Sequence, residues 1–241
     1  MDLKNVNLDL FLIRHADPAS LPNHWVFPHS PLSKRGIQQT KILGLVLRRY
    51  SLDLLLSSPL TRARQTASII AQENPQLLPL HDPQEHSWCS EIDLGEIGGM
   101  SDIEINQKYP PEEHPPPRQW KIPSSLVFRL LMTRKDYKLP DGEGLERFWT
   151  RITQGFSQFL KTQQYGDKNK IGIVSHGGPF TVITLLLLGK TFEDASYPCF
   201  FFHKADFTLV RIRDHQVAFL QSNPLNSSSI AFTSEIQRRK G

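Results

Sequence analysis

The sequence is poor in the residues that would indicate a disulfide-stabilised or membrane-spanning protein. It has two cysteines, Cys89 and Cys199, which lie far apart and form no Cys-x-x-Cys pair. This spacing argues against a disulfide framework and a thiolate metal site, and we expect a protein of the reducing cytoplasm. The longest apolar run, Val182 to Leu188, is much shorter than the roughly 20 residues that a membrane span needs. The charged N-terminal stretch, MDLKNVNLDL, predicts neither a signal peptide nor a membrane anchor.

Basic residues outnumber acidic residues by a small margin. Lysine and arginine total 28, aspartate and glutamate total 24, and the formal net charge is +4. Several of the basic residues lie in Arg48-Arg49 and in the last five residues, QRRKG, and no aromatic residues alternate with them. This pattern indicates solvated surface rather than a nucleic-acid binding face. A small anionic substrate fits the same composition.

Histidines are scattered through the expected loops without the spacing of a metal site. Five of them are His24, His29, His81, His86 and His114. None of these forms a His-x-x-x-His or His-Glu-x-x-His pattern, and no acidic cluster stands beside them. We therefore expect a protein that uses no metal and no cofactor.

Polar residues follow three short apolar runs, where we expect buried strands to end. The runs are Leu8–Ile13, Asp53–Leu56 and Ile171–Val174, and the polar residues after them are Arg14-His15, Ser57-Ser58 and Ser175-His176-Gly177. Open α/β sheets bind their ligands at the carboxyl ends of strands, so these residues are expected to meet in one crevice. Because helical patterns separate the runs, the sequence predicts a three-layer α/β/α fold with a doubly wound, mostly parallel sheet.

Two helices are predicted between the first strand and the proline-rich middle of the chain. Ser33 is suited to cap a helix whose apolar positions continue through Arg49. Pro59 is suited to the first turn of a second helix, which ends at about Gln72.

The second half of the chain predicts two more helices and a hairpin. Apolar residues from Leu145 to Phe159 fall on one face of an amphipathic helix, and Pro179 opens another helix. The segments Thr208–Ile212 and Val217–Leu220 predict a closing β-hairpin.

The chain is expected to be one domain, residues 1–222, with an inserted lid and a mobile tail. Proline is frequent and helical periodicity is weak in the predicted lid, residues 105–139, although Leu126–Met132 could form a short helix. Residues 223–241 are rich in serine and asparagine and predict the tail.

The three predicted strand ends carry groups that suit a phosphoryl group. Arg14, Arg62 and the histidines supply cationic or neutral nitrogen donors, and helix N-termini add backbone N–H donors. A transferring phosphoryl group spreads negative charge over its oxygens and chiefly needs such donors in fixed positions. The sequence therefore predicts a small phosphorylated substrate.

Five segments, in order, resemble the histidine phosphatase superfamily, which includes the cofactor-dependent phosphoglycerate mutases. The segments are LFLIRHAD, SSPLTRARQTA, SEIDLGEIGG, LPDGEGL and IVSHGG. The resemblance spans roughly residues 8 to 190. It implies that His15 is a nucleophile that becomes phosphorylated, that Arg14, Arg62 and Gly177 hold the phosphate, and that His176 is a second imidazole at the reacting oxygens.

The resemblance also implies an acid that protonates the leaving group. Glu91 matches that position, while Glu96 and Asp93 are nearby alternatives. A carboxylic acid in this role contributes on the order of 10²- to 10⁴-fold, because an alkoxide is a poor leaving group.

Several functions are compatible with this set of residues. Hydrolysis of a small phosphomonoester is the favoured prediction. Phosphoglycerate mutases carry a Tyr-x-x-Arg-Arg-Ser insert with two adjacent arginines. The arginines of residues 105–139 are Arg118, Arg129 and Arg134, and no two of them are adjacent. A protein phosphohistidine phosphatase would be a shorter chain without the segment from Glu91 to Lys138. A non-catalytic scaffold on the same fold usually loses a pocket residue, and none is lost here.

Overall fold

The computed structural model describes most of the chain. The described residues are 3–20, 24, 26–27, 29–77, 84–108, 141–163, 169–193, 202–222 and 231–235. Most of the predicted lid, including the expected helix Leu126–Met132, lies outside these residues, as does Cys199.

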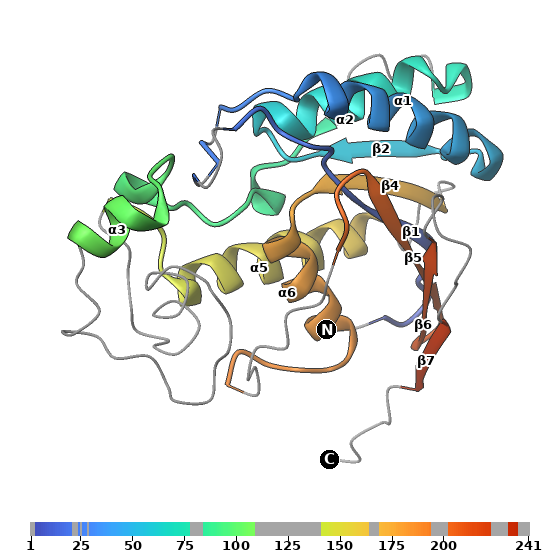
Figure 1. Ribbon diagram of the computed structural model, residues 1–241. Helices are drawn as coiled ribbons and strands as arrows, with labels where there is room; N and C mark the ends of the chain where they lie inside the picture. Colours follow the sequence, from blue (N-terminus) through green and yellow to red (C-terminus); the bar gives the residue numbers. More distant parts are fainter. Residues whose placement is uncertain are drawn as a thin grey trace.

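One seven-stranded sheet joins strands from both ends of the described chain (Figure 1). The strands are β1 (Asn7–Arg14), β2 (Leu54–Ser57), β3 (Gln84–Glu85), β4 (Lys170–Ser175), β5 (Asp206–Arg213), β6 (Gln216–Ser222) and β7 (Ala231–Glu235). Their order is β3-β2-β4-β1-β5-β6-β7. The neighbours from β3 to β1 pair in parallel, and those from β1 to β7 pair antiparallel. The strands β2, β4 and β1 are therefore adjacent, and their carboxyl ends meet at one edge.

Helices cover both faces of this sheet, which confirms the predicted three-layer α/β/α fold. The helices are α1 (Lys34–Leu47), α2 (Thr61–Gln72), α3 (Asp102–Lys108), α5 (Leu145–Gln163) and α6 (Gly177–Leu187). Figure 1 shows α1 and α2 on one side of the sheet and α5 and α6 on the other. The α3 helix lies beyond the edge toward which β2 points.

Alternation along β1 explains why this strand lies between two cores. Leu8, Leu10 and Leu12 pack into the core beneath α5 and α6. Phe11 and Ile13 pack into the core beneath α1 and α2. Successive side chains of a strand point to opposite faces, so a run that is apolar throughout fits a strand buried on both sides.

The helix starts depend on local chemistry that the sequence partly predicts. The Ser33 hydroxyl accepts a hydrogen bond from the backbone N–H of Gly36 at 3.0 Å, as expected for an N-cap. The prediction for Pro59 was wrong, because α2 begins at Thr61 and Leu60 is its N-cap. Pro59 lies in the turn between β2 and α2 instead.

The segment between α2 and α5 contains short elements that the weak periodicity concealed. These are the 3₁₀ turns η2 (Pro75–Leu77), η3 (Ser87–Cys89) and η4 (Gly95–Ile97), the two-residue strand β3, and α3. Another 3₁₀ turn, η1 (Arg48–Tyr50), directly follows α1. Such short pieces satisfy the backbone without repeating the sequence pattern of a longer helix or strand.

The expected tail needs a correction. The hairpin of β5 and β6 is confirmed, and its turn has positive φ at Asp214 and His215, as tight hairpin turns require. Beyond it, β7 pairs with β6 from Leu220 to Gln216. The part of the chain predicted to be a tail therefore contributes the edge strand of the sheet.

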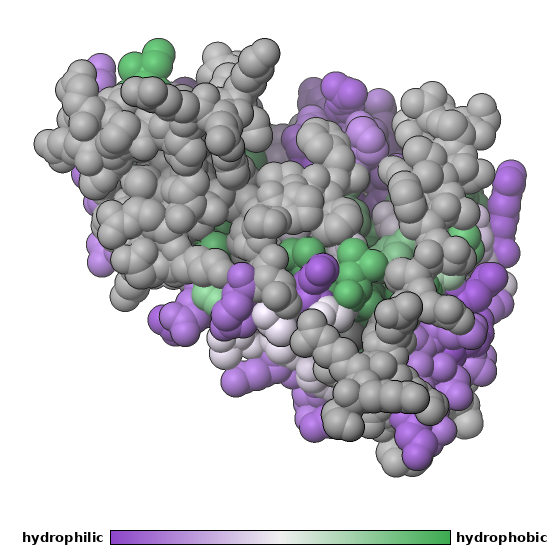
Figure 2. Space-filling model, turned by 90° about the horizontal axis from the view of Figure 1, so that it is seen from below, coloured by the Kyte–Doolittle hydropathy of each residue, from purple (hydrophilic) through white to green (hydrophobic). Residues whose placement is uncertain are grey.

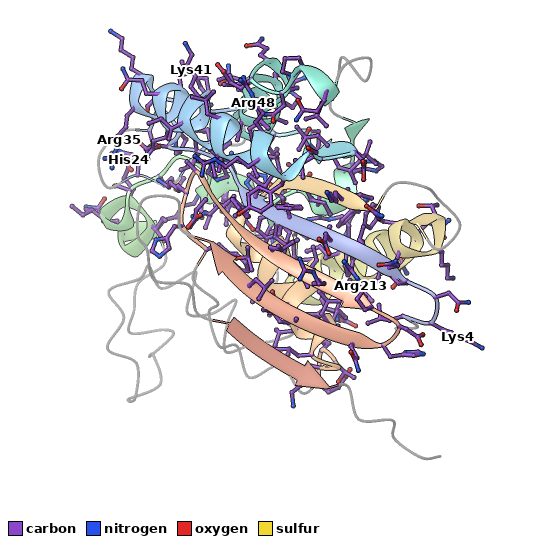
Figure 3. All side chains as sticks on the ribbon, turned by 90° about the vertical axis from the view of Figure 1, so that its right-hand side faces the viewer. Lys4, His24, Arg35, Lys41, Arg48 and Arg213 are labelled. Atoms are coloured by element: carbon purple, nitrogen blue, oxygen red, sulfur yellow. The ribbon has the colours of Figure 1, made fainter. Side chains whose placement is uncertain are left out.

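Figures 2 and 3 show where charged and apolar groups lie. In Figure 3 the labelled basic residues Arg35, Lys41 and Arg48 come from the α1 side, while Lys4 and Arg213 lie toward the opposite end of the sheet. Figure 2 shows hydrophobic surface near the middle of the face seen from below and hydrophilic surface toward its margin. Within the described ranges, no helix is both long and apolar enough to cross a bilayer.

Candidate active site

His15 directly follows β1 and is almost completely buried. Its backbone N–H donates to the carbonyl of Ser175, which continues the pairing of β1 with β4 beyond the strand end. The His15 Nδ1 atom is 2.8 Å from the carbonyl oxygen of Ala16. A carbonyl oxygen can only accept, so the contact assigns the ring proton to Nδ1 and leaves the lone pair on Nε2.

The surroundings of His15 keep its ring neutral. Burial, first of all, and the nearby charges of Arg62, Arg14 and Lys204 together lower the pKa of His15 to about 3. The contact with the Ala16 carbonyl opposes these effects. A neutral imidazole is the nucleophilic form, and His15 therefore has this form over the whole physiological pH range.

Two arginines flank this ring. The Nε–H group of Arg62, in the first turn of α2, donates to Nε2 of His15 at 3.3 Å. Arg14, the last residue of β1, donates from Nη1 to the carbonyl of Phe202 at 2.5 Å, while its buried Nε has no hydrogen-bond partner within the described chain. Burial lowers the pKa of both guanidinium groups, and the charge of Glu91 opposes this effect. The two forks remain charged and are suited to an anion.

His176 is the N-cap of α6 and lies beside His15. The two ring centroids are 4.9 Å apart, and Nε2 of His176 is 2.9 Å from the hydroxyl oxygen of Ser58. The side chain is fully buried. Burial, together with the electrostatic effects of His15 and Arg62, lowers the pKa of His176 well below the ordinary value.

Glu91 approaches the same place from the irregular chain after η3. Its Oε2 atom accepts a hydrogen bond from the Gly178 backbone N–H at 3.3 Å, and its Oε1 atom accepts one from Ile92 N–H at 3.1 Å. A Cβ atom at Gly178 would lie 2.1 Å from Oε1 of Glu91. Only glycine at this position leaves room for the carboxyl group at the N-terminus of α6.

The structure thus brings together the residues that the sequence singled out, namely Arg14, His15, Arg62, Glu91, His176 and Gly177. A Cβ atom at Gly177 would be 3.9 Å from the guanidinium carbon of Arg14, so this glycine borders the cluster. The two alternative acids have other contacts. Glu96 accepts a hydrogen bond from Lys108 at 2.6 Å, and Asp93 accepts one from the Gly95 N–H at 3.0 Å.

Three further residues support the site: Thr66 and Gly178, which had no predicted role, and Ser58, which was predicted only as a polar strand end. The Thr66 hydroxyl accepts from the Ala16 N–H at 3.1 Å and donates to the Arg62 carbonyl at 2.8 Å, so it links the turn after β1 to α2. Ser58 contacts His176, and Gly178 makes room for Glu91. For Thr66 the available signal was its spacing of four residues after Arg62, on one face of α2.

Metal-binding side chains do not gather here. Among the residues that the structure describes, no group of three or more His, Cys, Asp or Glu side chains could hold a metal ion. Cys89 is buried, and burial raises the pKa of its thiol to about 12, so it is not a thiolate.

Comparisons with known proteins agree with this geometry. The pattern of the histidine phosphatase superfamily (branch 1) matches residues 10–224, and the chain belongs to that superfamily. Phosphoserine phosphatase 1 of Hydrogenobacter thermophilus is 27% identical over 219 residues, which are 89% of this chain and 91% of that protein. A 2,3-bisphosphoglycerate-dependent phosphoglycerate mutase of Cytophaga hutchinsonii is 24% identical over 168 residues, 69% of this chain and 70% of that protein.

A solved structure supports the fold in particular. The α-ribazole phosphatase of Shigella flexneri superposes with a TM-score of 0.66 at 22% identity, covering 86% of this chain and 91% of that chain. The superfamily and these relatives define the class: this chain is an enzyme of the phosphatase and mutase type that acts on phosphate groups.

Proposed function

We propose that this protein hydrolyses a small phosphomonoester through a phosphohistidine on His15. The observation that carries the proposal is the state of the His15 ring. Its Nδ1–H is held by the Ala16 carbonyl, and its Nε2 atom accepts a hydrogen bond from Nε of Arg62 at 3.3 Å. An oxygen of a bound phosphoryl group would take the place of Nε2 as partner of that N–H. The phosphorus would then lie next to the free lone pair.

The first step forms one bond and breaks another. The His15 Nε2 atom attacks phosphorus, the bond from phosphorus to the ester oxygen breaks, and Glu91 gives its proton to that oxygen. Arg14, Arg62 and His176 stabilise the charge on the phosphoryl oxygens. In the second step water attacks the phosphohistidine, Glu91 accepts the proton of that water, and His15 leaves as a neutral imidazole.

The sequence favours hydrolysis over mutase activity. Relatives of both kinds match the chain, but residues 105–139 lack the adjacent arginines of the mutase insert. The relatives named for phosphoserine and for α-ribazole phosphate support a small phosphorylated metabolite as substrate.

The nucleophile is tested by trapping its phosphorylated form. Acid-labile, base-stable phosphate should appear on the protein when it is denatured shortly after mixing with labelled substrate, and His15→Ala should form none. Loss of a covalent nucleophile costs several orders of magnitude in kcat. The assignment is wrong if His15→Ala keeps more than about 1% of the wild-type turnover.

The acid is tested by comparing two leaving groups in one variant. Glu91→Gln should lower kcat on glycerol 2-phosphate by on the order of 10² or more, because its alkoxide needs a proton. The rate on p-nitrophenyl phosphate should stay within about tenfold, because nitrophenolate leaves without help. Arg62→Ala is the contrasting variant, which should lower both rates. Equal losses in Glu91→Gln would assign Glu91 a structural role instead.

A further inference from the structure

Glu91 stands on a segment that has little regular structure of its own. Residues 90–94, between the 3₁₀ turns η3 and η4, have irregular backbone, and Glu91 lies among them. A carboxyl group acts as an acid only when it is held at the reacting oxygen, and a displacement of about 1 Å can cost 10²-fold. Some other part of the molecule must therefore fix this segment.

Arg151, in the first half of α5, donates hydrogen bonds to that segment. Its Nη1 atom donates to three carbonyl oxygens, at distances of 3.0, 2.8 and 3.2 Å, and its Nη2 atom lies 3.4 Å from a fourth. The four carbonyls belong to Ser87, Trp88, Ser90 and Glu91. The guanidinium thus donates to carbonyls in and after η3 and reaches the backbone of Glu91 itself.

The Arg151 guanidinium is in turn fixed by a buried carboxylate. Glu143 accepts two parallel hydrogen bonds from it, from Nε at 2.9 Å and from Nη2 at 2.7 Å. Glu143 is only 7% exposed, and its backbone N–H donates to the Asp93 carbonyl at 2.9 Å. A two-pronged pair of this kind fixes the plane of the guanidinium as well as its position.

The Phe148 ring links Arg151 to the start of α6. The Arg151 guanidinium carbon lies 5.3 Å from the centre of the Phe148 ring. That ring approaches Gly178, where an added Cβ atom would be 3.0 Å from it. The α5 helix therefore contacts both the chain that carries Glu91 and the helix end against which its carboxyl group lies.

We propose that Arg151, held by Glu143, is a positioning residue that sets the place of the Glu91 carboxyl group. The proposal rests on the acid role of Glu91 given above. Neither Glu143 nor Arg151 need touch the substrate. Their effect should therefore depend on how much the leaving group needs a proton, and the binding of the phosphoryl group should stay unchanged.

Arg151→Lys is the principal variant. One ammonium group cannot donate to Glu143 and to three carbonyls at once, so the segment should lose its fixed position. We expect kcat on glycerol 2-phosphate to fall about tenfold or more, while kcat on p-nitrophenyl phosphate stays within about threefold. The inhibition constant of vanadate should change by less than about twofold, because Arg14, His15 and Arg62 are untouched.

The matched control is Arg147→Lys, which makes the same change one turn earlier on α5, at an exposed position. Both of its rates should stay within about twofold of wild type. The combined variant Glu91→Gln/Arg151→Lys should hydrolyse glycerol 2-phosphate within about threefold of Glu91→Gln alone, because the acid that Arg151 positions is already absent.

The outcomes separate this proposal from the one on which it rests. Absence of leaving-group selectivity in Glu91→Gln would overturn the acid role, and the positioning role with it. Normal selectivity in Glu91→Gln combined with equal losses on both substrates in Arg151→Lys, or with additive losses in the combined variant, would overturn the positioning role alone.

A second variant covers the case in which Arg151→Lys does not fold. Glu143→Gln keeps the size of the side chain and removes the charge that fixes the guanidinium. It should lower kcat on glycerol 2-phosphate about three- to tenfold with little change on p-nitrophenyl phosphate. Equal losses on the two substrates in a folded Glu143→Gln would contradict the proposal.

Discussion

At the scale of single residues, His15 combines two requirements that normally conflict. A nucleophile for a dianionic phosphate should lie beside cations, yet it must keep its lone pair. Burial and the charges of Arg14 and Arg62 meet both requirements, because they make the protonated ring unfavourable. The Ala16 carbonyl then decides which nitrogen keeps the lone pair.

The same burial predicts a pH dependence of stability. The pKa of His15 falls from about 6.5 in the unfolded chain to about 3 in the folded protein. Below pH 6.5 the unfolded state takes up a proton that the folded state does not, so stability falls by about 1.4 kcal/mol per pH unit from this residue until the pH reaches the folded pKa. Above pH 6.5 the residue makes no such contribution.

His15→Asn isolates this effect, since asparagine does not titrate. The free energy of unfolding of the wild type should fall between pH 7 and pH 5 by about 2 kcal/mol more than that of the variant, measured by urea denaturation at both pH values. Parallel losses in the two proteins would show that the ring is protonated in the folded state.

At the scale of one element, substitutions of the two glycines at the start of α6 test where the Glu91 carboxyl group lies. In Gly178→Ala the new methyl group meets Oε1 of Glu91, which is the end of a flexible side chain and can swing aside. Stability should change by less than about 1 kcal/mol, while kcat on glycerol 2-phosphate falls about tenfold or more.

The neighbouring position provides the control for that variant. In Gly177→Ala the new methyl group would make only an ordinary 3.9 Å contact with Arg14. Because Gly177 borders the phosphate site, any loss of kcat in this variant should be equal, within about threefold, on glycerol 2-phosphate and p-nitrophenyl phosphate. A loss selective for glycerol 2-phosphate in Gly177→Ala but not in Gly178→Ala would contradict the placement of Glu91 against Gly178.

The elements also show what the sequence could and could not predict. The apolar run Leu8–Ile13 predicted β1, and Ser33 predicted the start of α1. Both predictions are confirmed, because buried strands and N-caps depend on local chemistry. The edge strand β7 was missed, because it is short and follows a serine- and asparagine-rich stretch. The role of Arg151 was missed as well, because the backbone carbonyls that it contacts lie more than fifty residues earlier in the sequence and leave no motif.

At the scale of the whole molecule, the positive charges at the site come from side chains. The expectation of a metal-independent enzyme remains a prediction. Exhaustive chelation should leave kcat on p-nitrophenyl phosphate unchanged, because arginines stabilise the charge that a cation would otherwise stabilise. Vanadate, which mimics the trigonal bipyramidal arrangement of phosphorus, should inhibit the chelated enzyme. A chelated enzyme that regains activity only with added Mg²⁺ or Zn²⁺ would contradict this.

Domain limits remain predictions in part. The family pattern extends to residue 224, close to the expected end of the domain at Ser222, yet β7 extends the sheet to Glu235. The lid of residues 105–139 begins within α3, and most of it lies outside the described residues.

The position of β1 in the sheet has a consequence for folding. Its two neighbours, β4 and β5, both lie far downstream in the sequence, in the last third of the chain. On the ribosome, the apolar segment LDLFLI therefore emerges more than 150 residues before β4, its first partner strand. Such late, long-range pairing is slow and exposes a strand that can aggregate. The strand that leads to His15, the proposed nucleophile, should thus need protection by a chaperone while the chain is being made.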